Sequence, residues 1–142
     1  MEEKILLVDD EEKFLEMMAE RMRSRGMDVS TATSAAEAVR LAETESFDAI
    51  ILDLKMPEMD GIEVLKLLKK KRPDSQVILL TGHATVEKGI EAMKLGAVDF
   101  LEKPADLNAL AEKIKQAHTH KMLVVEKAIE EKLKQIITQK GW

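Results

Sequence analysis

The chain has 142 residues, which suits one domain of ordinary size with a small addition. Its composition is 45% hydrophobic and 35% charged with no cysteine, which indicates a globular body with a core and excludes disulfides, thiol catalysis and zinc–thiolate sites. The net charge of −5 argues mildly against direct contact with nucleic acid, and the lack of any apolar run of membrane-span length or of a signal peptide indicates a cytoplasmic protein without membrane contact.

The first part of the chain alternates short apolar runs with helical patterns. The apolar run at 4–8 predicts a strand, and apolar residues at helical spacing within 12–25 predict a helix. A weaker strand is expected at 27–32. Ser34 then opens a second helix, because Glu37 follows at the spacing of a capping box.

The same alternation continues through the rest of the chain. Further strands are expected at 49–54, 76–80 and 97–101. Helices are expected after each of them, the first opened by Asp60 and ended by Pro73, and the last beginning near Asp106. Five alternations whose strands are apolar throughout predict a doubly wound α/β fold: a five-stranded parallel sheet in the flavodoxin-like order 2-1-3-4-5, with helices on both faces.

Five polar residues stand at the carboxyl ends of four of these strands. They are Asp9 and Asp10, Asp53, Thr81, and Lys103. Each alone has a plain structural interpretation: the acidic run caps a helix, Asp53 is a turn carboxylate, Thr81 is a loop hydroxyl and Lys103 is a surface lysine. Together they favour a ligand site, because in doubly wound folds ligands bind at this edge of the sheet, beside the switch point between strands 1 and 3.

The residue types at this edge indicate phosphoryl-transfer chemistry. Three crowded carboxylates repel one another and stay ionised only if a cation joins them. Their hard oxygens suit Mg²⁺, which binds few carboxylates together with phosphate oxygens. One carboxylate then serves as a nucleophile on phosphorus, while the metal, Lys103 and Thr81 neutralise or hydrogen-bond the transferring oxygens.

The motifs that carry these residues resemble the response-regulator receiver domains of two-component and phosphorelay signal transduction. They are LLVDD, ILDLKMPEMDG, LLTGH and FLEKP, at 6–10, 51–61, 79–83 and 100–104. The resemblance runs from about residue 3 to residue 118, and in combination the four motifs are highly specific.

The resemblance implies a role for each acidic residue. Asp53 is the expected phosphoacceptor, and Asp9 and Asp10 form the acid pair. Asp10 and Asp53 are expected to bind Mg²⁺ directly with the backbone carbonyl of Lys55, and Asp9 mainly through water.

The resemblance also implies roles beyond the carboxylates. Thr81 and Lys103 are expected to hold the phosphoryl group, and Phe100 matches the switch aromatic that turns inward as the threonine hydroxyl moves toward phosphate. Lys55 and His83 stand at the two positions that tune the family's dephosphorylation rate.

The end of the chain differs from a minimal receiver. Residues 105–140 contain no glycine or proline, and an unbroken helix of that length spans about 54 Å, so it projects from the body or breaks near residues 119–120 and folds back. An apolar stripe follows, made by Met122, Val125, Ile129, Leu133 and Ile136. We therefore divide the chain into a receiver domain at 1–118 and a helical extension at 119–142, whose stripe favours a homodimer or another protein partner.

The function expected from the sequence is that of a single-domain response regulator, not an enzyme. A histidine kinase or histidine phosphotransfer protein supplies the phosphoryl group, and output passes through protein contact. The first alternative is a receiver fragment of a longer transcription regulator. The second is an aspartate-nucleophile phosphatase of the haloacid-dehalogenase type, which Lys55 disfavours because a second aspartate is normally needed at that position.

Overall fold

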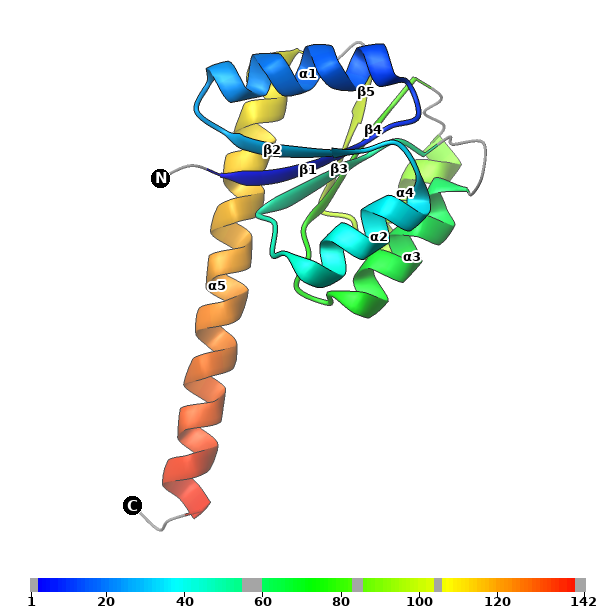
Figure 1. The fold of residues 1–142 in the computed structure, drawn as a ribbon. Coiled ribbons are helices and arrows are strands. Elements are labelled where there is room, and N and C mark those ends of the chain that lie inside the picture. Colours follow the sequence, from blue (N-terminus) through cyan, green and yellow to red (C-terminus); the bar gives the residue numbers. More distant parts are fainter. Residues whose placement is uncertain (1–2, 55–59, 83–85, 104–105, 140–142) are drawn as a thin grey trace.

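The computed structural model describes residues 3–54, 60–82, 86–103 and 106–139, apart from the side chains of Thr81, Val86, Val124, Val125 and Gln139. Strands and helices alternate along the chain (Figure 1). The elements are β1 Lys4–Val8, α1 Glu12–Ser24, β2 Asp28–Ala32, α2 Ala35–Thr44, β3 Ala49–Leu52, α3 Gly61–Lys71, β4 Val77–Thr81, α4 Val86–Lys94, β5 Asp99–Glu102 and α5 Leu107–Gln139.

The five strands form one sheet in the order β2-β1-β3-β4-β5, and all four pairings are parallel. The predicted fold and strand order are therefore confirmed. Val8 pairs with Leu52, so the residues that follow β1 and β3 emerge side by side at the carboxyl edge. The backbone N–H of Asp53 donates to the carbonyl of Val8 at 3.1 Å, which extends the ladder by one residue.

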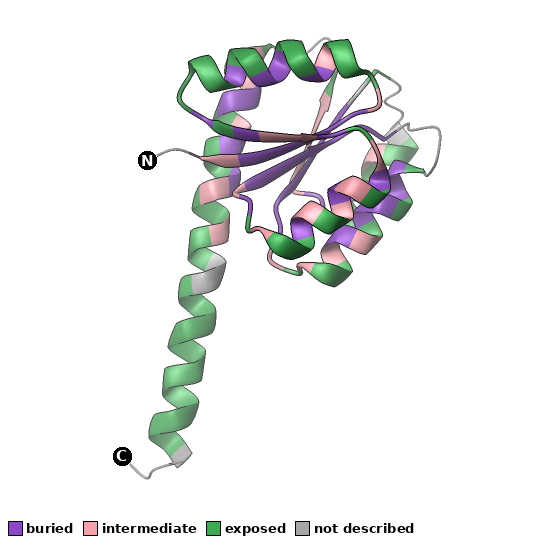
Figure 2. Ribbon diagram, viewed as in Figure 1, coloured by how far each residue is buried: buried purple, intermediate pink, exposed green. Residues whose placement is uncertain are grey.

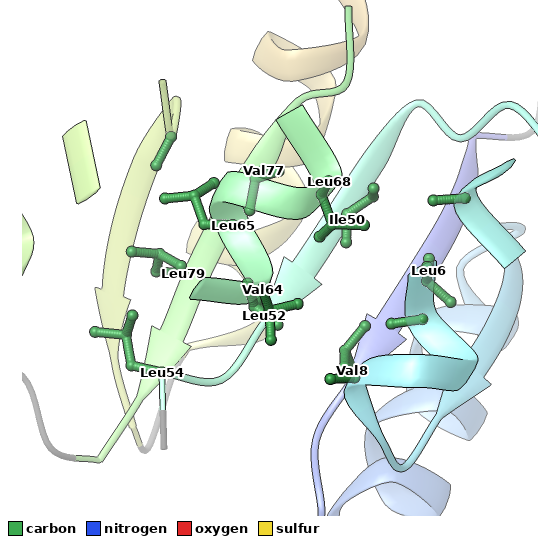
Figure 3. Packing of buried hydrophobic residues seen from close by; sticks show 14 of the residues in the cluster. Leu6, Val8, Ile50, Leu52, Leu54, Val64, Leu65, Leu68, Val77 and Leu79 are labelled. Atoms are coloured by element: carbon green, nitrogen blue, oxygen red, sulfur yellow. The ribbon is translucent and has the colours of Figure 1, made fainter. Parts of the chain in front are cut away.

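The core has two layers, one on each face of the sheet. Along β1, Leu6 and Val8 belong to the cluster that packs under α2, α3 and α4, shown in Figure 3. Ile5 and Leu7 belong to the opposite cluster, which α1 and α5 cover. Because both faces are covered, the central strand β3 is buried at every residue, and the central strands read as continuous apolar runs (Figure 2).

Local sequence signals set several helix ends. The hydroxyl of Ser34 accepts a hydrogen bond from the Glu37 backbone N–H at 3.2 Å, as the capping-box spacing predicted. Asp60 caps α3 by accepting from the Ile62 N–H at 3.0 Å. Of the six methionines that the structure describes, Met18, Met22 and Met27 are buried in the core, and Met17, Met93 and Met122 are exposed on the outer faces of their helices.

The last helix is continuous and projects from the body. At 1.5 Å per residue its 33 residues span about 50 Å. Leu110, Ile114 and Ala117 pack against the sheet, whereas the later turns extend away from it (Figures 1 and 2). The projecting path is therefore the correct one of the two alternatives, without a break near residues 119–120.

Two side chains, Lys121 and His118, tie α5 to the turn between α2 and β3. Lys121 Nζ donates to the Ser46 hydroxyl at 2.6 Å and to the Phe47 carbonyl at 2.8 Å. His118 Nδ1 lies 2.6 Å from Asp48 Oδ1. We call these contacts the helix clamp, because they fix α5 at the point where it leaves the body.

Among the described residues, no helix is long and apolar enough to cross a membrane.

Candidate functional site

The sheet topology delivers the predicted site residues to one edge. Asp9 and Asp10 directly follow β1, Asp53 follows β3, and Lys103 follows β5. Thr81 is the last residue of β4 and pairs with Glu102 of β5, so its backbone lies at the same edge, while its side chain is outside the described part of the structure.

The three aspartates converge into one acidic cluster. One carboxylate oxygen from each of Asp9, Asp10 and Asp53 lies within 4.8 Å of the other two. Asp9 is 1% exposed and Asp53 is 6% exposed, and Asp10 is the most exposed of the three. The cluster therefore has two carboxylates set into the protein and one at its solvent side.

Lys103 reaches into this cluster. Its ammonium lies 2.5 Å from Asp9 Oδ2 and 3.7 Å from Asp53 Oδ2. The lysine side chain is only 16% exposed, and its Nζ stands 4.1 Å from the centroid of the Phe14 ring. The surface-lysine interpretation is therefore wrong. Sequence reasoning did not find the contact with Phe14, because an aromatic residue in the first turn of an amphipathic helix reads as ordinary core.

Asp9 is held by more than the lysine. Its Oδ1 accepts a hydrogen bond from the Glu11 backbone N–H at 3.0 Å. Glu11 is the N-cap of α1 and makes no side-chain capping bond, so capping by that residue does not explain the acidic run. Burial raises the pKa of the Asp9 carboxyl above its ordinary value of 3.8, against the opposing effects of Lys103 and the Glu11 N–H, and the nearby Asp53 raises it further.

The charge balance and donor set of the cluster fit a divalent cation. Three carboxylates face one ammonium among the described residues within reach, which leaves an excess of negative charge when all are ionised. Hard carboxylate oxygens at this spacing are ligands that Mg²⁺ and Ca²⁺ prefer.

After Asp53, the backbones of Leu54 and Gly61 approach each other closely. A Cβ built on Gly61 would lie 2.3 Å from the Leu54 Cα, and the Gly61 N–H donates to the Leu54 carbonyl at 2.8 Å. Only glycine fits here. Lys55, between these two points, and His83 both lie outside the described residues, so their expected roles have no structural counterpart.

Phe100 stands on β5 beside the site. It is half-buried, pairs with Leu79 and packs against the core on the side of α4. Gly89 of α4 faces its ring, since a Cβ there would lie 3.8 Å from two ring atoms. The ring therefore occupies the junction between α4 and the sheet.

The fold and the cluster define a doubly wound α/β domain with an acidic, cation-suited site at its topological switch point. The chain belongs to the response regulator receiver domain family, whose model matches residues 5–115. The receiver domains of response regulators are signalling modules of two-component systems, as the four sequence motifs predicted.

A curated relative has a similar sequence over most of this chain. It is the photosynthetic apparatus regulatory protein RegA of Cereibacter sphaeroides, 38% identical over 104 residues, which are 73% of this chain and 56% of that protein. Across eight curated relatives the chain spans 24–57% of their length.

Solved structures share the fold. A receiver domain protein from Clostridium thermocellum is 38% identical with a TM-score of 0.81, over 86% of this chain and 98% of that one. A response regulator from Burkholderia pseudomallei, described with a phosphorylated aspartic acid, a calcium ion and citrate, is 26% identical with a TM-score of 0.76, over 98% of this chain and 86% of that one.

Proposed function

We propose that this chain is the phosphoacceptor of a two-component or phosphorelay system, and that Asp53 takes the phosphoryl group. The observation that carries the proposal is the placement of Asp53: a buried carboxylate next to the Lys103 ammonium, inside a cluster with Asp9 and Asp10. The Burkholderia relative, with its phosphorylated aspartic acid and calcium ion, supports both the modification and the need for a cation.

The proposed step is an in-line displacement at phosphorus. An oxygen of Asp53 forms the new P–O bond while the bond from phosphorus to the donor breaks, and the leaving group departs with that electron pair. Lys103, 3.7 Å from Asp53 Oδ2, is placed to pair with an oxygen of the incoming group. The product is a mixed anhydride, whose hydrolysis by water returns the carboxylate and releases phosphate.

The acidic cluster is the proposed Mg²⁺ site. Asp10 and Asp53 would hold the ion together with the backbone carbonyl of Lys55, and Asp9 would contact it mainly through water. When bound, the ion supplies positive charge that neutralises the transferring oxygens. Thr81 is proposed as a hydrogen-bond donor to the phosphoryl group, Phe100 as the aromatic switch, and Lys55 with His83 as the residues that tune its lifetime.

Labelling by a small acyl phosphate tests the phosphoacceptor. With Mg²⁺ present, intact-mass measurement is expected to find one added phosphoryl group, and Asp53→Asn abolishes it because an amide cannot form the anhydride while keeping nearly the same shape. Treatment with EDTA is expected to block labelling of the wild type. Circular dichroism controls for the fold of the variant. An asparagine variant that labels as well as the wild type would overturn the assignment.

The partners proposed are a histidine kinase or histidine phosphotransfer protein as donor, and an output protein. Residues 1–118 form the proposed phosphoacceptor body, and 119–142 a contact extension. Exposed apolar residues on α4, Ile90 at 52% and Met93 at 47%, support an output surface beside Phe100.

A second candidate is the receiver region of a longer transcription regulator. This candidate is favoured because the chain spans only part of the length of its relatives. It covers 26% of the transcriptional regulatory protein GlrR of Escherichia coli. The length of the natural reading frame distinguishes the two. In either case the regulatory names of the relatives favour a signalling role over a phosphatase, and steady turnover of a phosphate monoester would contradict that.

A further inference from the structure

The part of α5 beyond the helix clamp has an apolar face that no described residue of the body covers. Met122 is 55% exposed, Ile129 57%, Leu133 54% and Ile136 40%. The predicted stripe also included Val125, whose side chain lies outside the described part of the structure. A helix with one apolar face toward solvent needs a partner to bury that face.

The four side chains form a narrow strip with charged flanks of opposite sign. At about 100° per residue they fall within roughly 60° of the helix circumference. Lys132 lies along one flank, on the same side as Lys121, whose ammonium is held by the turn at residues 46–47. Glu126 and Glu130 lie along the other flank, with Ile137, 42% exposed, between them around the helix. Glu130 already has an exposed contact with Lys134 on its own helix, at 3.5 Å.

We propose that the occupant of this face is a second copy of this chain, with the two helices paired in parallel. In a parallel pair, each flank of one helix meets the opposite flank of the other, so Lys132 faces the glutamate flank of the second copy. In an antiparallel pair each flank meets its own copy, so the two Lys132 flanks face each other and the two glutamate flanks face each other. The separation of charge on this helix therefore favours the parallel arrangement.

The helix clamp supports the proposal by presenting the face as part of a preformed rod. Lys121 is bound to the turn at residues 46–47 one residue before Met122, so the helix is already ordered where the apolar face begins. Pairing therefore requires little further ordering of the backbone near the body. Parallel pairing places both receiver bodies at one end of the pair and the last described turns of both α5 helices at the other; Figure 1 shows these two ends in a single chain.

The absence of cysteine allows a direct test of orientation in the full chain. Ile136→Cys is expected to cross-link to its own copy under a mild oxidant, because equal positions of the strip meet in a parallel pair. Lys127→Cys is the matched control: it lies on the opposite side of the helix, and its cross-linking is expected to be much slower. Mixed Met122→Cys and Ile136→Cys chains that join to each other, rather than to themselves, would overturn the parallel arrangement.

Sedimentation measures whether pairing occurs at all. The full chain is expected to run as a dimer, and Ile129→Asp to shift it to monomer, because an ionised carboxylate in the centre of the strip cannot be buried. Ile129 is exposed, so the receiver body should keep its circular dichroism and its phosphoryl labelling. A wild type that remains monomeric at high concentration would refute self-association and leave the strip to a different protein. Because the proposal is independent of phosphorylation, failure of the labelling experiment would not change either result.

Discussion

At the scale of single residues, the acidic cluster combines two opposing demands on Asp9. The residue is buried, which disfavours its charged form, yet it is paired with Lys103 and accepts the Glu11 N–H. Burial is the largest of these effects and leaves the Asp9 pKa raised. An ionised Asp9 therefore lowers the stability of the folded state when no metal ion is bound beside it, and functional sites commonly carry such a cost.

The raised pKa gives a prediction for stability. Because the folded-state pKa of Asp9 lies above its ordinary 3.8, the folded state binds the Asp9 proton more tightly than the unfolded state does. The stability that this residue contributes is therefore present below pH 3.8 and lost as the pH rises through the folded-state pKa. In EDTA at neutral pH, Asp9→Asn is therefore expected to unfold at a higher temperature than the wild type, and the difference should vanish below pH 3.8. Thermal melts across pH measure it. A less stable variant at neutral pH would mean that the lysine pair outweighs burial.

The sequence located the residues of the site better than it described their contacts. Asp9, Asp53 and Lys103 could be predicted because each follows a recognisable apolar run, and parallel strands bring their carboxyl ends together. The ring of Phe14 under the ammonium could not, because its position depends on how α1 packs across the sheet.

At the scale of elements, glycine distinguishes a close backbone approach from an ordinary helix position. Gly61 begins α3 where a side chain would collide with the Leu54 backbone, whereas Gly89 lies within α4 with room for a methyl group at 3.8 Å from Phe100. In the sequence, Gly61 ends the ILDLKMPEMDG motif and Gly89 stands within a predicted helix. The difference arises from a contact between the ends of a loop, which periodicity does not encode.

We predict opposite outcomes at these two glycines. Gly61→Ala is expected to destabilise the domain by about 1–3 kcal/mol, because the loop ends must separate. It is also expected to slow labelling of Asp53, which directly precedes Leu54. Gly89→Ala is the matched control, expected to be neutral or to stabilise by roughly 0.5–1 kcal/mol through its helix propensity. Urea unfolding of both variants measures the difference. Equal effects would show that the Leu54 contact is not the constraint.

At the scale of the whole molecule, the direction of α5 is decided by contacts far apart in sequence. The sequence predicted a long helix but left open whether it projects or folds back. The answer depends on His118 and Lys121 meeting Asp48 and the turn at 46–47, some 70 residues earlier. Helical periodicity alone carries no information on such long-range contacts.

The last prediction concerns this clamp. Lys121→Met keeps the length of the side chain but removes the hydrogen bonds to the Ser46 hydroxyl and the Phe47 carbonyl. Amide exchange is expected to become faster around residues 118–122 and in the turn at 46–48, while the centre of the sheet keeps its protection, because local openings there cost less than global unfolding. Loss of the two bonds should lower the global free energy of unfolding by only about 1–2 kcal/mol.

Lys127→Met provides the control for this prediction, because it changes the same residue type on the same helix at an exposed position. Its exchange pattern should match that of the wild type. Unchanged exchange in Lys121→Met would show that the apolar contacts of Leu110, Ile114 and Ala117 suffice to hold α5. Faster exchange confined to the clamp would instead mean that Lys121 and His118 hold α5 in place where it leaves the body. The surface that α5 presents to a partner would then begin where these contacts end.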